Sequence, residues 1–371
     1  MRKKVWLSLF VIFCFTVFIL PICANAISAK SAILIETQSG KIAYAKNENL
    51  RLPMASTTKI MTAIVVLENL QLDKKVTIEP CMTGIEGSSI YLQAGETLTV
   101  EELLYALLLE SANDAAVALA LTVSKTIEDF AEMMNIKAAQ LGLTDTHFTN
   151  PHGLDDSEHY TTARELGIIA AYALENDSFK EIVSTYKKEI SLNDGQGCRL
   201  LINHNRLLRS YDGATGIKTG FTKKCGRCLV SCATRDGVTL ICVTLNAPND
   251  WQDHKQLLDL GFDNYECVRL ANPGCYTIEL QTIGGEKATL FAENKDGLSV
   301  TLERGKADIY AVVEANRHVS TPINKGDCVA KIVFYNGTEK LGELPLFAKE
   351  NIKQLSYKKS LFERIFNNGK N

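Results

Sequence analysis

Hydrophobic and polar positions recur with different periods along the chain, and each period predicts a kind of element. Two short stretches, 32–35 and 41–44, flank a polar turn with a glycine and predict a β-hairpin. Residues 60–67 are all apolar except Thr62, and a helix that is apolar all round lies inside a domain. Thr99 and Glu102 form the capping-box pattern that opens another helix. Further patterns predict helices over 113–123, 127–141, 163–175 and 251–260, and a hairpin of strands 228–234 and 238–244.

The pattern changes near residue 266, where short alternating strands are separated by glycine-containing turns. We therefore expect a mixed helix-and-strand domain over 27–265 and a small all-β domain over 266–348. Over 349–371 the pattern becomes helical, with apolar Leu361, Phe362, Ile365 and Phe366 opposite a basic side. A basic amphipathic helix at a chain end favours docking to a membrane surface. The alternative is that this tail packs on its own β domain.

The N-terminal segment has the pattern of a secretory signal peptide. Three basic residues precede an apolar run, and the small residues Ala24 and Ala26 follow it. We read residues 1–26 as the signal peptide, and an uncleaved membrane anchor as the alternative. The mature chain is then exported, to the outer face of the cytoplasmic membrane or the cell wall.

Composition and charge exclude some functions. Apolar residues make up 46% of the chain, and the net charge is −3, with no basic stripe that would bind nucleic acid. Cys225, Cys228 and Cys232 could be read as metal ligands, but no fourth ligand lies at a suitable spacing. Because Cys228 and Cys232 fit a strand alternation, we expect buried thiols, with no metal and no cofactor.

The pattern Ser-x-x-Lys occurs three times, and only one occurrence opens a buried helix. In that one, Ser56 and Lys59 lie three residues apart, so their side chains share a helix face. A serine hydroxyl becomes a good nucleophile when a base takes its proton. Lysine can be that base if burial or a nearby cation lowers its pKa. The helix N-terminus also favours a developing oxyanion.

Two more short motifs give this pair a context. Ser111 and Asn113 form a Ser-x-Asn motif on a turn between two predicted helices, and Lys218-Thr219-Gly220 begins a predicted strand. Together with Ser56 and Lys59 they match the motif set of penicillin-binding proteins and serine β-lactamases.

The chain thus resembles the low-molecular-mass penicillin-binding proteins that are serine-type D-alanyl-D-alanine carboxypeptidases. Further stretches that match are 52–56, 148–154, 159–163 and 203–208, and the resemblance runs from 33 to 346. It implies an α/β (α+β) catalytic domain of the penicillin-binding and serine β-lactamase type, with an antiparallel sheet and helices. It also implies a small all-β C-terminal domain and an amphipathic anchor.

The resemblance also implies roles for single residues. Ser56 would form the acyl-enzyme with a D-Ala-D-Ala stem peptide of peptidoglycan, or with a β-lactam inhibitor. Lys59 would be the base, and Ser111 would relay a proton. The substrate would be bound by Asn113, Lys218, Thr219, Gly220 and Phe221, where Gly220 leaves room for the peptide along the strand edge. The backbone N–H groups of Ser56 and Phe221 would form the oxyanion hole.

Two positions depart from the family pattern. Where the family often has an arginine and a second basic residue near the substrate's carboxylate, this chain has His204 and, as we align it, His254. A histidine binds a carboxylate best when it is protonated, so substrate affinity would fall as pH rises above about 6.5. The alternative is that His204 is a loop histidine that makes one backbone hydrogen bond. The other histidines of the matching segments are expected to be structural.

Other functions remain open from the sequence. Endopeptidase or transpeptidase action on cross-links would differ from carboxypeptidase action only in the acyl donor or acceptor. A β-lactamase would use the same motifs with a carboxylate that activates water, but Glu165 is read as part of a helix start. A cell-wall-binding protein without turnover would keep the fold and lack catalysis.

Overall fold

The computed structural model describes residues 26–192 and 197–355. The predicted signal peptide lies outside this part except for its last residue, and so does the amphipathic stretch of the predicted C-terminal helix. Within the described residues, no helix is long and apolar enough to span a membrane.

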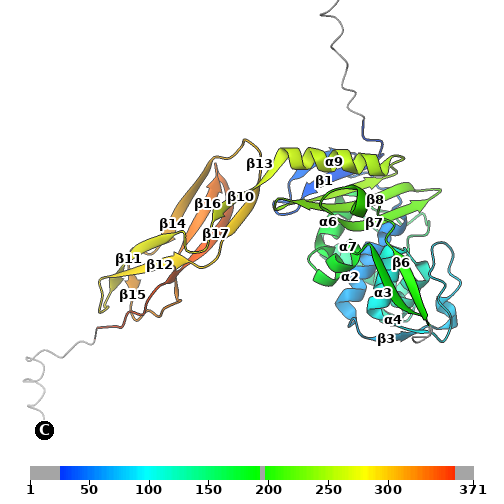
Figure 1. The fold of residues 1–371 in the computed structure, drawn as a ribbon, viewed down its shortest axis with the longest axis horizontal. Coiled ribbons are helices and arrows are strands. Elements are labelled where there is room, and N and C mark those ends of the chain that lie inside the picture. Colours follow the sequence, from blue (N-terminus) through cyan, green and yellow to red (C-terminus); the bar gives the residue numbers. More distant parts are fainter. Residues whose placement is uncertain (1–25, 193–196, 356–371) are drawn as a thin grey trace, which may run out of the picture.

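A five-stranded antiparallel sheet forms the centre of the first domain (Figure 1). Its order is β2 (Ile42–Lys46), β1 (Ser31–Glu36), β9 (Val238–Leu245), β8 (Gly226–Arg235) and β7 (Ala214–Thr222). The helix α9 (Asp250–Asn264) covers one face, and α6 (Ala163–Ala173) and α7 (Asp177–Ser184) cover the other. Alternate residues therefore enter two cores: Leu34 packs on the α9 side, and Ile33 packs on the opposite side. Both predicted hairpins are confirmed.

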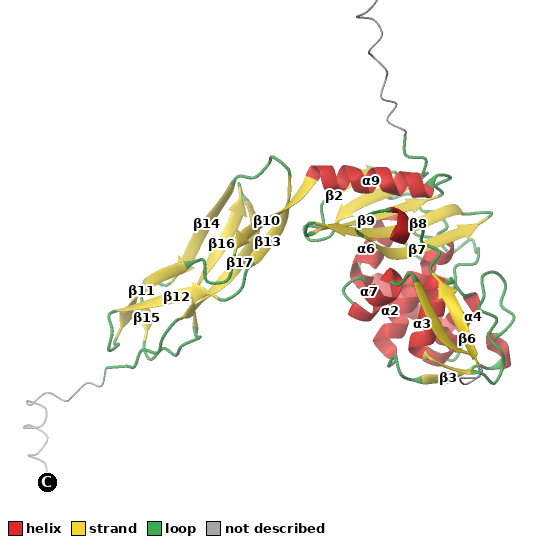
Figure 2. Cartoon of the chain, in the orientation of Figure 1, coloured by secondary structure: helices red, strands yellow, loops and turns green. Residues whose placement is uncertain are grey.

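A helical layer lies below the sheet and surrounds α2 (Figure 2). Its elements are η1 (Ala55–Thr58), α2 (Lys59–Asn69), η2 (Pro80–Met82), α3 (Val100–Leu109), α4 (Asn113–Val123) and α5 (Ile127–Gln140), with the short strands β3 (Lys75–Thr77), β4 (Thr97–Thr99), β5 (Lys187–Leu192) and β6 (Gly197–Ile202). The short helix α8 (Leu207–Ser210) contacts β7. The first eight residues of α2 are all buried, as its uninterrupted apolar pattern predicts. The capping box of Thr99 and Glu102 is also present.

The second domain is all-β, as predicted, and follows α9 directly. β10 (Tyr265–Ala271) pairs with β13 (Leu298–Glu303). The other strands form a six-stranded sheet in the order β14 (Ile309–Ala315), β16 (Cys328–Asn336), β17 (Glu339–Ala348), β12 (Thr289–Asn294), β11 (Thr277–Ile283) and β15 (Val319–Ser320).

The prediction of a helix from residue 349 onward is wrong for its first residues. Ile352 forms a β-bridge with Ile323, and Gln354 forms one with Gly285. Ile352 is fully buried beside Leu290 and Ala348, so burial of this apolar side chain holds the segment extended against the β domain.

The turn between β1 and β2 joins the two domains. Gln38 donates through Nε2 to the backbone oxygen of Ser299 (2.9 Å), and its Oε1 accepts from the N–H of Thr301 (2.6 Å). Lys41 forms an ion pair with Glu339 at 3.0 Å. The same hairpin thus ends the central sheet and contacts the β domain.

Candidate active site

Ser56 lies on the 3-10 turn η1, directly before α2. The preceding residue, Ala55, is buried and has φ +48°, a left-handed conformation that is costly for a residue with a Cβ. Surrounding contacts must therefore hold this turn in shape. The predicted buried helix is thus preceded by this tighter turn.

Lys59 is the first residue of α2, and its side chain is fully buried. Its Nζ lies 3.0 Å from Ser56 Oγ and donates to Asn113 Oδ1 (2.7 Å) and to the backbone oxygen of His152 (2.6 Å). Burial, followed by the nearby Lys218 amine, lowers the pKa of Lys59 well below its ordinary value. A neutral amine has two N–H donors and one lone pair. Two donors for Asn113 and His152 leave the lone pair for the hydroxyl proton of Ser56.

Lys218 is also buried, and its amine donates to the backbone oxygen of Thr219 (3.0 Å). Burial lowers the pKa of Lys218 to about 7. Each lysine amine is thus poorly solvated, and a proton on Lys218 disfavours a proton on Lys59. This arrangement keeps Lys59 available as a base.

The Ser-x-Asn motif lies on the turn between α3 and α4. Ser111 adopts φ +60° and lines the same pocket as Ser56. Asn113 is the first residue of α4, and its Nδ2 donates to the backbone oxygen of Glu86 (2.6 Å) while its Oδ1 accepts from Lys59. Its predicted contact with substrate stays a prediction, because both amide atoms already have a partner within the protein.

The Lys-Thr-Gly motif lies in the middle of β7 and not at its start, where it was expected. β7 is the edge strand of the central sheet, and Thr219, Gly220 and Phe221 line the pocket. A Cβ on Gly220 would lie 3.1 Å from both Ser56 N and Met54 O. The glycine therefore lets β7 approach the turn that carries Ser56, a reason that the sequence reasoning did not give.

The pocket in front of Ser56 has a volume of about 280 Å³. It is lined by Ser56, Ser88, Ser111, His204, Arg206, Thr219, Gly220, Phe221, Arg227, Asp250 and Trp251. Six of the residues that were predicted from the sequence thus meet at its wall. Lys59, Lys218 and Asn113 lie buried behind it.

Two arginines of the pocket were missed by the sequence reasoning. The guanidinium groups of Arg206 and Arg227 lie 6.0 and 5.7 Å from the ring centre of Trp251, and Arg227 Nε donates to Asp250 Oδ1 at 2.9 Å. Arg227 is opposite Phe221 in the β7–β8 ladder, which brings it to the same wall. Only the register of this hairpin could have indicated that position.

Of the two histidines that were expected near the substrate's carboxylate, His204 lies at the pocket and His254 does not. His204 lines the pocket, and its Nε2 lies 3.1 Å from Glu110 Oε2. The expectation for His254 is wrong: its ring is fully buried between Ser231 Oγ (2.6 Å) and Thr244 Oγ1 (2.9 Å). Burial lowers the pKa of His254 to about 3. Its place on α9 turns it toward the sheet, where it cannot attract a carboxylate.

Other residues considered from the sequence have structural contacts. Cys225, Cys228 and Cys232 are buried free thiols. Glu165 accepts hydrogen bonds from the N–H groups of Thr144 and Asp145 and does not line the pocket.

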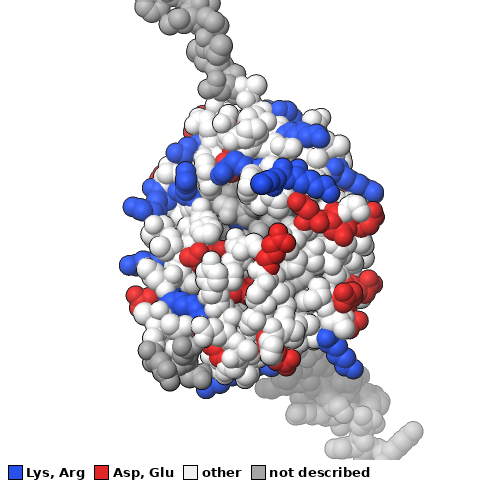
Figure 3. All heavy atoms as spheres, turned by 90° about the vertical axis from the view of Figure 1, so that its right-hand side faces the viewer, with Lys and Arg blue, Asp and Glu red and all other residues white. Residues whose placement is uncertain are grey.

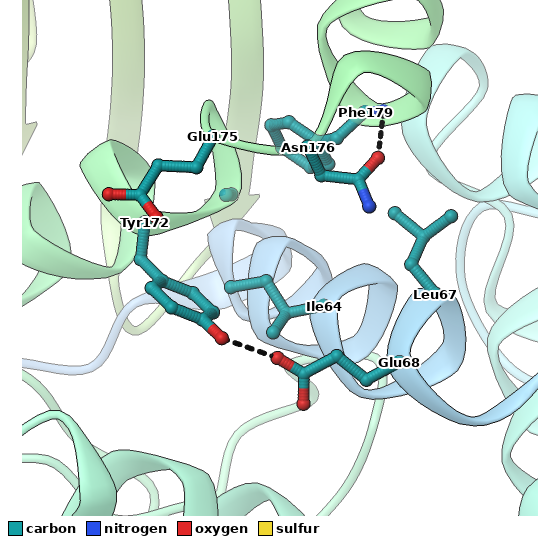
Figure 4. Close-up of a pocket in the computed structure, with 8 residues that line it drawn as sticks. Ile64, Leu67, Glu68, Tyr172, Glu175, Asn176 and Phe179 are labelled. Atoms are coloured by element: carbon teal, nitrogen blue, oxygen red, sulfur yellow. Dashed lines mark hydrogen bonds between the residues drawn. The ribbon is translucent and has the colours of Figure 1, made fainter. Parts of the chain in front are cut away.

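A second hollow, of about 230 Å³, lies against the C-terminal half of α2 (Figure 4). The Tyr172 hydroxyl donates to Glu68 at 2.7 Å, and Asn176 caps α7 by accepting from the N–H of Phe179. None of its lining residues belongs to the three motifs.

The end of the catalytic domain that faces the viewer in Figure 3 has charges of both signs. Lys and Arg form a band across its upper part, and Asp and Glu are grouped below it. Such a surface differs from the single-sign field that attracts nucleic acid.

Comparison with known proteins gives consistent matches over both domains. The family model described as D-alanyl-D-alanine carboxypeptidase matches residues 21–249. The model described as penicillin-binding protein 5, C-terminal domain, matches residues 266–354.

Individual relatives agree with the family models. The chain is 33% identical over 339 residues to the D-alanyl-D-alanine carboxypeptidase DacF of Bacillus subtilis, covering 89% of this chain and 87% of that protein. It is 31% identical over 364 residues to DacA of Escherichia coli, covering 92% and 89%. The crystal structure of penicillin-binding protein 5 from Haemophilus influenzae aligns with a TM-score of 0.66 at 29% identity, covering 88% of this chain and 98% of that one.

Proposed function

The chain belongs to the D-alanyl-D-alanine carboxypeptidase family of penicillin-binding serine peptidases, and we propose that Ser56 is the residue on which its acyl-enzyme forms. The activity of the family is hydrolysis of the terminal D-alanine from peptidoglycan stem peptides. The observation that supports Ser56 most directly is the contact of its hydroxyl with the buried, low-pKa amine of Lys59.

In the acylation step, the neutral Lys59 amine takes the Ser56 proton as Oγ attacks the carbonyl carbon of the penultimate D-alanine. The N–H groups of Ser56 and Phe221 stabilise the negative oxygen that develops. Ser111 gives its hydroxyl proton to the leaving nitrogen and receives the proton that Lys59 took from Ser56, the C–N bond breaks and D-alanine departs. Lys59, neutral again, takes a proton from the attacking water, and this proton returns to Ser56 Oγ as the ester C–O bond breaks and the shortened peptide leaves.

The carboxylate of the terminal D-alanine would bind at the end of the pocket that holds Thr219. His204 and the two arginines Arg206 and Arg227 line this pocket, so positive charge is available there without the arginine that the family often has. Arg227 is oriented by Asp250, and a guanidinium matches the planar geometry of a carboxylate.

A β-lactam would acylate the same hydroxyl and block it. The β-lactamase alternative lacks support from Glu165, whose carboxylate is used by backbone donors away from Ser56. A non-catalytic wall binder would not need a lysine base in contact with a serine, and so it is disfavoured.

Export and membrane docking remain part of the proposal, since the segments that carry them lie outside the described residues. The signal-peptide pattern of 1–26 and the basic amphipathic pattern near the C-terminus support a location outside the cytoplasm at the membrane surface. A chain truncated after Leu355 should lose binding to anionic vesicles and keep its rate on a small peptide.

The central test is incubation with an N-acyl-D-Ala-D-Ala peptide, with measurement of released D-alanine. Wild type should release D-alanine and form a one-to-one penicillin adduct by mass spectrometry, and Ser56→Ala should do neither. Ser184→Ala is the matched control, because Ser184 and Lys187 form a second Ser-x-x-Lys string away from the pocket. An equal loss of D-alanine release in Ser56→Ala and Ser184→Ala, or release of D-alanine by Ser56→Ala, would contradict the proposal.

A further inference from the structure

We infer that His159, which does not line the pocket, is a positioning residue that orients the oxyanion-hole peptide through Thr58. This inference rests on the proposed role of Ser56. His159 and Thr58 are buried, and Thr58 is the residue before the base Lys59. Neither was singled out in the sequence for a role in the reaction.

Three hydrogen bonds in a row connect Thr149 to Ala55 through His159 and Thr58. Their directions are fixed because the first group, a backbone N–H, can only donate and the last, a carbonyl oxygen, can only accept. The backbone N–H of Thr149 donates to His159 Nδ1 at 3.0 Å, so Nδ1 must be the unprotonated nitrogen. The proton of the neutral ring is therefore on Nε2, which lies 2.7 Å from Thr58 Oγ1. Thr58 Oγ1 in turn donates to the carbonyl oxygen of Ala55 at 2.8 Å. Thr149, His159, Thr58 and Ala55 thus form one directed relay.

The relay ends on the carbonyl of the peptide group whose N–H is the proposed oxyanion donor. The carbonyl of Ala55 and the N–H of Ser56 belong to the same planar peptide group. Fixing the direction of the Ala55 oxygen therefore fixes the direction of the Ser56 N–H. A donor on the carbonyl also polarises the peptide, which strengthens the N–H as a hydrogen-bond donor.

The strained backbone explains why such a brace is needed. Ala55 has φ +48°, and a residue with a Cβ leaves this conformation unless its surroundings hold it. Gly153 closes over the same oxygen: a Cβ there would lie 2.0 Å from Ala55 O and 2.8 Å from Thr58 Oγ1. The brace and the turn are thus packed against each other without space for another side chain.

The relay requires the neutral form of His159, because a proton on Nδ1 would face the N–H of Thr149. Burial is the main reason that the pKa of His159 is lowered to about 4. The charged and titratable groups that interact with it are Asp156, His147, Asp155, Lys59 and His152. At neutral pH the ring is uncharged and the relay is complete.

The test compares two threonines of the same helical segment. Thr58→Val keeps the shape and removes the relay, whereas Thr58→Ser keeps the hydroxyl. Thr62→Val is the matched control. Thr62 is equally buried, and its Oγ1 also donates to a backbone oxygen, that of Pro151, at 2.6 Å. Removing an oxyanion donor outright costs about 100- to 1,000-fold in rate, so loss of its orientation should slow acylation by about 10- to 100-fold.

Penicillin acylation of Ser56, followed by mass spectrometry, should be slowed in Thr58→Val and close to wild type in Thr58→Ser and Thr62→Val. The KM for a D-Ala-D-Ala peptide should change much less than kcat. Wild-type acylation in Thr58→Val, or equal slowing in Thr62→Val, would overturn the inference. If wild type itself formed no adduct, the proposed function would fail instead.

A second measurement needs no variant. Nitrogen-15 chemical shifts of the His159 ring in the wild-type protein should report a protonated Nε2 and an unprotonated Nδ1 from pH 8 down to about pH 5. A proton on Nδ1 in this range would overturn the relay even if Thr58→Val failed to fold.

Discussion

Arg227 Nε lies 2.9 Å from Asp250 Oδ1, and this contact joins β8 to the first turn of α9 at the wall of the active-site pocket. The carboxylate of Asp250 is buried, whereas the Arg227 side chain is partly exposed. The acid thus orients the guanidinium, which keeps donors free for an incoming anion.

Arg227→Leu should raise the KM for a D-Ala-D-Ala peptide by about 10- to 100-fold, since a hydrogen bond to a charged group contributes about 1.5–3 kcal/mol. The change in kcat should be small, because Arg227 does not contact Ser56 or Lys59. Steady-state release of D-alanine measures both constants. Arg235→Leu, near the other end of the same strand, is the control and should leave KM unchanged.

A C-terminally amidated peptide separates charge recognition from a general disturbance of the pocket. Wild type and Arg227→Leu should process it at similar low rates. A large difference between them on this uncharged substrate would show that Arg227 does not act on the carboxylate.

Lys59→Arg should abolish acylation, with a fall in rate of at least about 100-fold, the lower limit for general acid–base catalysis. Arginine is not deprotonated in proteins, so, unlike the neutral Lys59 amine, it cannot take the Ser56 proton. Stopped-flow acylation by a chromogenic β-lactam measures the rate. Lys187→Arg, in the second Ser-x-x-Lys string, should react like wild type; acylation by Lys59→Arg at a similar rate would exclude Lys59 as the base.

The free energy of unfolding should rise with pH above about 7, because burial lowers the pKa of Lys218 in the folded protein to that value. The unfolded chain binds more protons between this pKa and the ordinary lysine pKa of about 10.4, so stability increases with pH in this window. One pKa unit corresponds to about 1.36 kcal/mol, so Lys218→Met should reduce the total increase in unfolding free energy over this pH window by a few kcal/mol at most.

Urea unfolding at pH 6.5, 8 and 9.5 measures this slope. Lys223→Met, an exposed lysine of the same hairpin, should keep the wild-type slope. A wild-type slope in Lys218→Met would mean that Lys218 has an ordinary pKa in the folded protein.

The sequence could predict the elements and the contact between Ser56 and Lys59 because both depend on local spacing. The apolar run of α2 indicated a buried helix, and its first residues place Lys59 next to Ser56. The all-β domain was likewise visible from its alternation and its glycine turns.

Contacts that depend on register or on a helix face could not be predicted in this way. Arg227 reaches the pocket because it is opposite Phe221, and His254 turns away because it faces the sheet from α9. The bracing of Ala55 by Thr58 and His159 joins residues that are 101 positions apart, which no local pattern reveals.

The glycine of the Lys-Thr-Gly motif, Gly220, has two possible explanations: space for the substrate peptide, or close approach of β7 to the turn that carries Ser56. If the space is needed for the substrate, as expected from the sequence, an alanine would hinder binding of the peptide. In the structure the missing side chain faces the nucleophile turn, where a Cβ would lie 3.1 Å from Ser56 N and 3.2 Å from the Cβ of Ala55. An alanine would then push on the turn that carries Ser56.

Gly220→Ala should therefore lower kcat and penicillin acylation together, and lower stability by about 1–3 kcal/mol, the range for overpacking. KM should change little, because the atoms that the added methyl group would meet belong to the turn that carries Ser56. Gly197→Ala, another strand glycine, whose added Cβ would meet only the flexible Leu192 side chain at 3.3 Å, is the control for the intrinsic effect of the substitution. If Gly220→Ala instead raised KM and left penicillin acylation unchanged, the glycine would serve the substrate, and the contact between β7 and the nucleophile turn would be incidental to catalysis.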